Sequence, residues 1–497
     1  MGGSLVRKVT GASGIGYGVN LWEVSPPRSV TGEALNVIGM VAELPWGDVD
    51  VITTVTNPAE FFATFYPNEF DAAVKDYTTY RAILALLNKP IFTKGGLKIV
   101  RVGATSQVKA FKTDTGTGTV TCTAKCFGAL GNQIKRQWTA ATDLDALKRN
   151  LVITIGSQYS ATYENLTVAN VDQVDDPFVT VTKNTLTVFP VAGSAEALAT
   201  GSDGAAVAGD YVGSGGSEKG IQLFYGESVK VSVLFVAECP SALLNAVNAG
   251  LEAYVQACDK GLVVLCTVDG QTSANAITYV ADYPDDRLVY VWPRVKTTNF
   301  FDPNVAEIEV DGNAFAAAAI ANVDAWLSPG GAGGAKFLTG ITGLETEATS
   351  RTTMDALSTA GVVPWFMSTA MGGAILYRGR TTAVDGTRIF RRRMTDYLMD
   401  AIGGFAEHYV ETQLDLVLSD QVLGPNTGGF IAAVQRFLGN ERSQTHLQSF
   451  SVDPWSQNTQ EDIDGGRWTT YLAVKLYSMA EEIVLKAEIG ETVTISE

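Results

Sequence analysis

The chain has 497 residues, of which 46% are hydrophobic and 18% are charged, a balance that indicates a folded globular protein rather than a disordered one. This length is enough for about three domains, each with a core of its own. Asp and Glu outnumber Lys and Arg by 53 to 36, which gives a net charge of −17. Because such a surface repels phosphate backbones, the composition argues against direct binding of nucleic acid.

The cysteines and the apolar runs exclude further classes. The five cysteines, at positions 122, 126, 239, 258 and 266, form no Cys-x-x-Cys pair, so we expect reduced, structural thiols and no zinc site. The first 17 residues contain no apolar segment of the kind found in signal peptides. The most apolar run, residues 314–321, is far shorter than the ~20 residues that cross a bilayer, so we expect no membrane insertion.

The N-terminal part of the chain divides into three segments. Residues 1–34 are expected to form an extended arm, because their one β-prone stretch, residues 19–24, precedes two prolines. Residues 35–103 read as strand, helix and strand, which predicts a compact α/β part of a core. Residues 104–218 carry Thr, Gly and Val in short alternating runs, which predicts an inserted, outer antiparallel β domain.

The rest of the chain also divides into three. Residues 219–335 alternate strands with helices, which predicts a middle α/β domain with a mainly parallel sheet and a topology like that of subtilisin. Residues 336–486 carry a long helix near residues 391–418, a second helix from about residue 429 and a two-strand pattern. Residues 487–497 are predicted to form a C-terminal arm. The predicted fold class is mixed α/β, with a core formed by N- and C-terminal parts, the middle domain and the inserted β domain.

Catalytic chemistry has few candidates in this sequence. The only two histidines are His408 and His446, and the middle domain has no His and no Gly-x-Ser-x-Gly motif, so a hydrolytic triad cannot form there. The glycine-rich run at residues 328–337 lacks the ending of a phosphate-binding loop. The acidic groups at residues 285–286 and 461–464 lack the spacing of a calcium loop and fit turns and helix caps better. We therefore expect no catalytic, cofactor-binding or metal-binding residues.

One basic cluster stands out in this acidic protein. Six arginines fall within sixteen residues, and Asp385 is the only acidic residue among them. They are Arg378, Arg380, Arg388, Arg391, Arg392 and Arg393. They either form a solvated face that pairs with internal carboxylates, or they make a basic contact surface for an acidic neighbour. The segment from residue 453 onward has the opposite sign, and complementary charge at two places suits a subunit that polymerises head to tail.

Two short β-prone pieces lie near the ends of the chain. A lone strand leaves its N–H and C=O groups unpaired, so each piece is stable only when it joins the edge of a sheet. If that edge belongs to another subunit, strand exchange links the chains. The candidate arm residues are Val19, Leu21, Trp22, Val24, Thr492, Val493 and Ile495.

Several sequence segments follow one another in a characteristic order. The earlier ones are NLWEVSPP, KGGLKIVRV, GALGNQI and DDRLVYVWPRV, and the later ones are ALSTAGVVPWF, GGAILYRGRTT, FRRRMTDYLMDAI and SFSVDPWSQNTQEDIDGGRWTTYLAVKLY. This ordered set resembles the tail sheath proteins of contractile-tailed (myovirus-type) bacteriophages and related contractile injection devices. Residues 104–218 match the family's pattern poorly.

The resemblance implies a structural subunit and no enzyme. Copies would polymerise helically, as stacked rings around a tail tube protein, and contract to drive the tube through the host envelope for genome ejection. The arms would exchange strands between neighbours, the C-terminal domain would face the tube, and the six arginines would be a candidate tube or neighbour contact. Baseplate and tail terminator proteins are further implied partners, on a virion tail assembled in the host cytoplasm.

Two alternatives remain open at the level of sequence. One is an α/β hydrolase-like enzyme that uses the sheet of residues 220–330, and the other is a different self-assembling shell protein. A phage tail, a bacteriocin and a secretion device are equally compatible with the resemblance.

Overall fold

The computed structural model describes most of the chain. The described residues are 36–70, 96–226, 229, 231–258, 261–298, 307–335, 338, 340–346, 350–407, 429–454 and 456–479. The chain forms two compact units, residues 34–393 and residues 394–497 together with 1–33. The predicted arms and the predicted helix beyond residue 407 lie outside the described residues.

The larger unit is built on an eight-stranded sheet with the order β18-β17-β13-β12-β11-β1-β3-β2. Its inner strands are parallel, and β2 and β18 pair antiparallel at the two edges. The strands are β1 (Ile38–Ala42), β2 (Ile52–Val55), β3 (Leu97–Arg101), β11 (Val233–Val236), β12 (Leu262–Val264), β13 (Leu288–Trp292), β17 (Val362–Ser368) and β18 (Gly373–Leu376). The sheet therefore takes strands from both ends of this unit as well as from its middle.

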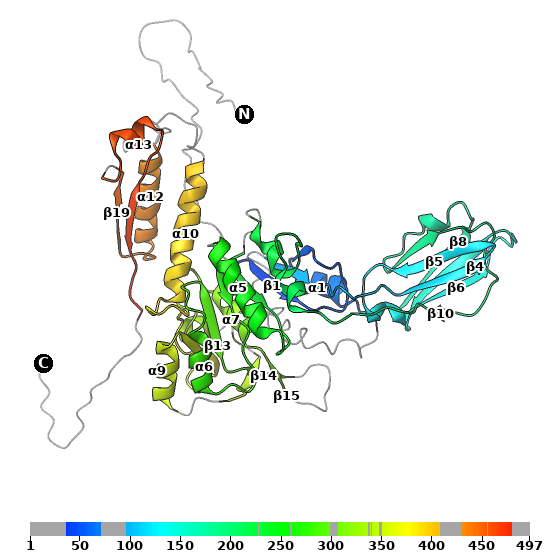
Figure 1. Ribbon diagram of the computed structural model, residues 1–497, viewed down its shortest axis with the longest axis horizontal. Helices are drawn as coiled ribbons and strands as arrows, with labels where there is room; N and C mark the ends of the chain where they lie inside the picture. The colour runs from blue at the N-terminus through cyan, green and yellow to red at the C-terminus, as the bar shows by residue number, and fades with distance from the viewer. Residues whose placement is uncertain are drawn as a thin grey trace, which may run out of the picture. The chain divides into compact units, whose positions relative to one another are not determined.

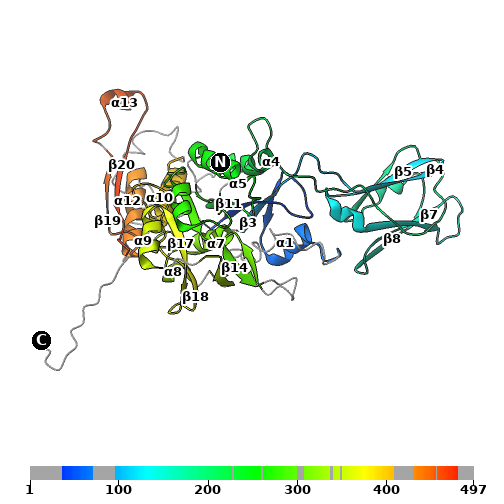
Figure 2. The ribbon, with the colours of Figure 1, turned by 60° about the horizontal axis from the view of Figure 1, so that its bottom comes forward.

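The central strands are continuous apolar runs because both faces of the sheet are covered. On one face, α5 (Leu244–Cys258) and α6 (Ser273–Val280) contribute to one core cluster. On the other, α1 (Pro58–Phe65) and α7 (Asn313–Asn322) contribute to a second cluster, as the layers in Figure 2 show. Every residue of α7 is buried, which fits a helix that is apolar all round. Among the described residues, no helix is long and apolar enough to cross a membrane.

Local signals in the sequence set several helix starts. Asn57 caps α1 by accepting the Glu60 N–H (2.9 Å) ahead of Pro58, and Thr272 caps α6 in the same way. Ser350 caps α9 (Arg351–Thr359). A second, three-stranded sheet of order β15-β14-β16 adds to the α7 side of the core. Its strands are β14 (Val295–Thr298), β15 (Glu307–Val310) and β16 (Ile341–Leu344), with the short α8 (Ala332–Ala335) between the last two.

The predicted antiparallel β domain is confirmed between β3 and β11, and it carries the cyan strands of Figure 1. One sheet has the order β10-β6-β7-β8 and the other β4-β5-β9, and both enclose one apolar core. The strands are β4 (Phe111–Gly116), β5 (Gly118–Ala124), β6 (Ile134–Ala140), β7 (Arg149–Ile155), β8 (Tyr159–Leu166), β9 (Val179–Lys183) and β10 (Glu196–Ala197). The chain returns through α4 (Ala208–Val212) and a 3-10 helix (Gly220–Tyr225) to β11.

The division between the two units falls within α10 (Ile389–Ala406), just before Met394. The described part of the smaller unit continues with α12 (Phe430–Ser443), β19 (Ser449–Asp453), α13 (Gln460–Asp464) and β20 (Tyr471–Lys475). The rings of Phe405 and Phe430 stack with centroids 6.0 Å apart. The predicted two-strand pattern is confirmed, because β19 and β20 pair antiparallel with Ser449 opposite Lys475.

Candidate functional site

The carboxyl ends of the parallel strands hold a buried network of charges. Asp311 is completely buried, and its carboxylate accepts the N–H groups of Thr267 (2.9 Å) and Asn313 (3.0 Å). The Asp311 N–H donates to Glu238 (2.6 Å), whose other oxygen accepts from Arg294 (2.9 Å). Burial, opposed by Arg294 and reinforced by Glu238, raises the pKa of Asp311 to about 6. These contacts tie the ends of β11, β12 and β13 together.

Three carboxylates beside this network could in principle hold a cation. The side chains of Asp269, Glu309 and Glu345 approach one another within 4.8 Å. Arg294 lies 3.9 Å from Asp269, and Lys296 lies 3.6 Å from Glu309, while Glu345 accepts the Gly270 N–H (2.6 Å). The cluster therefore has cationic and amide partners within the protein, and we interpret it as a structural charge network.

The smaller unit contains a second network, which the sequence did not signal. The buried Glu441 accepts from the Tyr397 hydroxyl (3.2 Å) and lies 2.7 Å from Nδ1 of His446. Burial, together with the Glu441 charge, raises the pKa of Tyr397 to about 12. The three side chains link α10, the end of α12 and the turn before β19. His408 lies outside the described residues.

The arginines of the basic cluster have different surroundings. Arg378 forms an ion pair with Asp355 (3.0 Å), and Arg392 forms one with Asp286 (3.2 Å). Arg393 is buried and donates to the backbone oxygen of Asp324. These partners lie in α9 and in the segments before β13 and after α7, so part of the cluster stabilises the larger unit.

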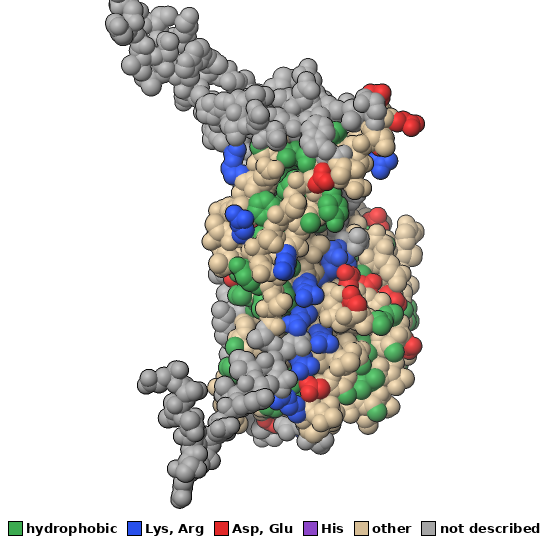
Figure 3. All heavy atoms as spheres, turned by 90° about the vertical axis from the view of Figure 1, so that its left-hand side faces the viewer, with side chains coloured by type: hydrophobic (Ala, Val, Ile, Leu, Met, Phe, Trp, Pro, Cys, Tyr) green, Lys and Arg blue, Asp and Glu red, His purple; other side chains and the backbone are tan. Residues whose placement is uncertain are grey.

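The other three arginines surround a loop. Arg380 and Arg388 pair through their backbones across the loop between β18 and α10, and Arg391 is exposed in the first turn of α10. On the face drawn in Figure 3, Lys and Arg side chains gather in a column. Within the cluster, Arg391 is exposed, whereas the other five arginines are half-buried or buried.

The sheet of β19 and β20 has two strands, and no other described strand pairs with either of them. Its residues are exposed or half-buried. Because a lone two-stranded sheet is only marginally stable, added strands at its edges would stabilise it. The predicted arm residues Val19, Leu21, Trp22 and Val24, and the C-terminal Thr492, Val493 and Ile495, lie outside the described residues, so their pairing stays a prediction.

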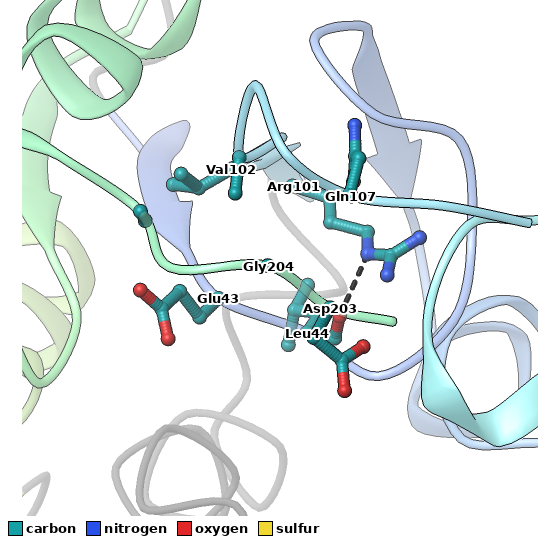
Figure 4. A pocket seen from close by; sticks show the side chains of 9 residues that line it. Glu43, Leu44, Arg101, Val102, Gln107, Asp203 and Gly204 are labelled. Carbon is teal, nitrogen blue, oxygen red and sulfur yellow. Dashed lines mark hydrogen bonds between the residues drawn. The ribbon is translucent and has the colours of Figure 1, made fainter. Parts of the chain in front are cut away.

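Arg101 fastens the base of the β domain to the core. Its side chain is buried, and its guanidinium donates to the backbone oxygens of Leu44 (2.6 Å), Gly47 (2.7 Å) and Phe127 (2.9 Å). Figure 4 shows it beside a small hollow, with the bond to Leu44 dashed. Packing of Phe70 against Phe178, with ring centroids 5.5 Å apart, strengthens the same junction.

This architecture of a mixed α/β core, an inserted β domain and a C-terminal unit is similar in fold to solved tail sheath proteins. The sheath tail protein of Desulfitobacterium hafniense superimposes with a TM-score of 0.60 and 16% identity, over 93% of this chain and 100% of that one. The sheath tail protein of Listeria innocua gives 0.58 and 13%, over 90% and 96%.

A third similar structure is the helical sheath of the anti-feeding prophage in its contracted state. It superimposes with a TM-score of 0.55 and 14% identity, over 97% of this chain and 99% of that chain. No family model and no curated protein matches the sequence. At these identities the similarity establishes the fold alone.

The buried Asp311 predicts a pH dependence of stability. Because its folded pKa is raised from 3.8 to about 6, folding is penalised above pH 6 and the penalty is relieved as the pH falls. The free energy of unfolding should therefore gain about 1 kcal/mol from this group between pH 7 and pH 5. Urea unfolding of the wild type and of Asp311→Asn at both pH values measures it. Equal pH profiles for the two proteins would contradict the assignment.

The Arg101 clamp predicts a large loss of stability on substitution. Arg101→Met keeps an apolar stem but leaves buried carbonyl oxygens without donors, so the midpoint of thermal unfolding should fall by about 5 °C or more. Lys183→Met, an exposed change in β9 of the same unit, is the matched control and should shift the midpoint by less than about 1 °C. Calorimetry checks both, and similar midpoints for the two variants would refute the clamp.

Proposed function

We propose that this chain is a structural subunit of a contractile tail sheath. It polymerises helically around an inner tube and contracts to drive the tube through the host envelope for genome ejection. The observation that carries the proposal is the similarity, over 97% of this chain, to a helical sheath in its contracted state. The strongly acidic net charge of −17 agrees with a protein kept away from the genome by an intervening tube.

Strand exchange links the copies in this proposal. Within the described part of the chain, β19 and β20 pair only with each other, and their outer edges are suited to accept extended segments through main-chain hydrogen bonds. The arms at residues 19–24 and 492–495 supply such segments from neighbouring copies. Each copy donates its arms to one neighbour and accepts those of another, so the contact is heterologous and continues along a helix.

Contraction needs no hydrolysed cofactor in this mechanism. Copies assemble in an extended, metastable lattice, and re-packing of whole domains into a lower-energy lattice releases the stored free energy while the arms keep the chains connected. The partners are other copies of this chain, the tail tube, and baseplate and tail terminator proteins. The particle is assembled in the host cytoplasm and becomes part of the virion tail.

A role as an α/β enzyme has less support. The carboxylates at the strand ends are held by Arg294 and by backbone amides, and the similar solved structures are sheath components. Robust hydrolytic turnover that one substitution in this network abolishes would favour the enzyme. Closed particles in place of cylinders would favour a shell protein.

The arm mechanism predicts different outcomes for two N-terminal deletions. Removal of residues 1–16 leaves the β-prone stretch at residues 19–24 and should leave polymerisation intact. Removal of residues 1–24 takes that strand away and should give soluble chains that form no cylinders. Electron microscopy and sedimentation of the purified chains read the result. Normal cylinders from the longer deletion would count against strand exchange by this arm.

A further inference from the structure

The loop at residues 381–387, between β18 and α10, exposes an apolar side chain, Val384, to solvent. Val384 is 90% exposed, the highest value among the large hydrophobic side chains that the structure describes. A single exposed aliphatic residue is common on protein surfaces. Whether Val384 marks a contact surface therefore depends on the rigidity of the loop and on the side chains around it.

Hydrogen bonds within the loop fix its shape. Thr381 and Thr387 close its ends, with the Thr381 N–H donating to the Thr387 oxygen (2.9 Å). The Asp385 carboxylate accepts both the N–H (2.9 Å) and the hydroxyl (2.7 Å) of Thr387. Gly386 has a φ of +69° and donates to the Ala383 oxygen (3.0 Å), which completes the turn.

The loop is also fastened to the sheet below it. Thr382 is buried, and its N–H donates to the Leu288 oxygen (2.9 Å) at the start of β13. Its hydroxyl lies 3.0 Å from the Asp285 oxygen and 3.1 Å from the Asp285 nitrogen. Val384 therefore projects from a preorganised support, and little conformational entropy is lost when a partner covers it.

Positive charge surrounds the exposed valine. Arg380 and Arg388 stand at the two sides of the loop base, and Arg391 follows in the first turn of α10. Asp385 is the one carboxylate of the loop. The Thr387 hydroxyl and N–H lower the pKa of Asp385, and Arg391 adds to this effect. Arginine beside a fixed apolar side chain is a composition typical of interface centres.

We propose that this loop is a docking knob, in which Val384 enters an apolar socket on a second copy of this chain and the arginines face acidic side chains around it. The proposal rests on the polymerisation proposed above and adds a contact that strand exchange does not supply. Copies with a net charge of −17 repel one another, so a basic island that meets the acidic surface of the next copy offsets part of that repulsion.

The charges of the described chain favour a second copy as the occupant. Its surface offers acidic regions of the required sign, such as the exposed Glu461 and Asp464 of α13. A knob on one face and its socket on another make a heterologous contact, which is the type that continues along a helical lattice. Nucleic acid is disfavoured as the occupant by the same net charge.

Two substitutions test the knob on the full chain. Val384→Asp removes the apolar contact and adds a charge, and Arg391→Glu reverses part of the basic rim. Each should raise the critical concentration for assembly of the purified chain about tenfold or more. Both positions are at the surface, so the midpoint of thermal unfolding should stay unchanged.

Matched controls keep the test specific. Val191→Asp changes a valine of similar exposure, 85%, in the β domain, and Lys183→Glu reverses an exposed lysine of the same domain. Both should assemble within about twofold of the wild-type concentration. If Val384→Asp assembles like these controls, the proposal is overturned. If Val384→Asp assembles normally but no longer binds a tube protein, the proposal is also overturned, because the loop then contacts the tube and not a second copy.

Cylinder formation and self-association are measured separately, so failure of the proposed function can be distinguished from failure of the docking knob. If the wild-type chain forms no cylinders, the polymer proposal fails, while docking is still measured by sedimentation equilibrium at high concentration. There the wild type must self-associate, and Val384→Asp must not. Equal self-association of the two chains overturns the knob.

Discussion

The pairing of β1 with strands on both of its sides constrains the rest of the larger unit. Ile38 lies opposite Leu97 of β3 and opposite Val233 of β11, so the chain that leaves the sheet after β3 must return two strand positions away. The whole β domain lies in the connection between β3 and β11, so these two strands hold both of its ends. Arg101, at the end of β3, holds the carbonyl oxygens at the point of exit, which explains why a charged side chain is buried there.

Local patterns predicted much of this architecture. The alternation of apolar runs and helices indicated the parallel sheet, and the Thr- and Val-rich runs indicated the antiparallel domain, because both patterns depend on which faces are buried. Long-range pairing was beyond these patterns. For example, nothing in the run of residues 336–486 indicated that its strand β17 pairs with β13 in the central sheet.

The candidate surfaces were predictable in part. Six close arginines were visible in the sequence, but the separation into internal pairs and surface charge depends on Asp286 and Asp355, which reach them only through the fold. Val384 gave a weaker signal, a Val-Asp-Gly turn between arginines, which reads as an ordinary loop until its exposure is known. The Glu441 network required the packing of α10 against α12 and left no pattern in the sequence.

The helix α7 limits how this sequence can change. Six of its ten residues are alanine, and all ten are buried against the centre of the sheet. A larger side chain would overpack the site at a cost of about 1–3 kcal/mol, and glycine, the only smaller residue, would cost about 1 kcal/mol in helix propensity. Alanine is thus close to the only residue these positions tolerate. Mutational drift in distant descendants of this chain should leave this helix as one of its slowest-changing segments.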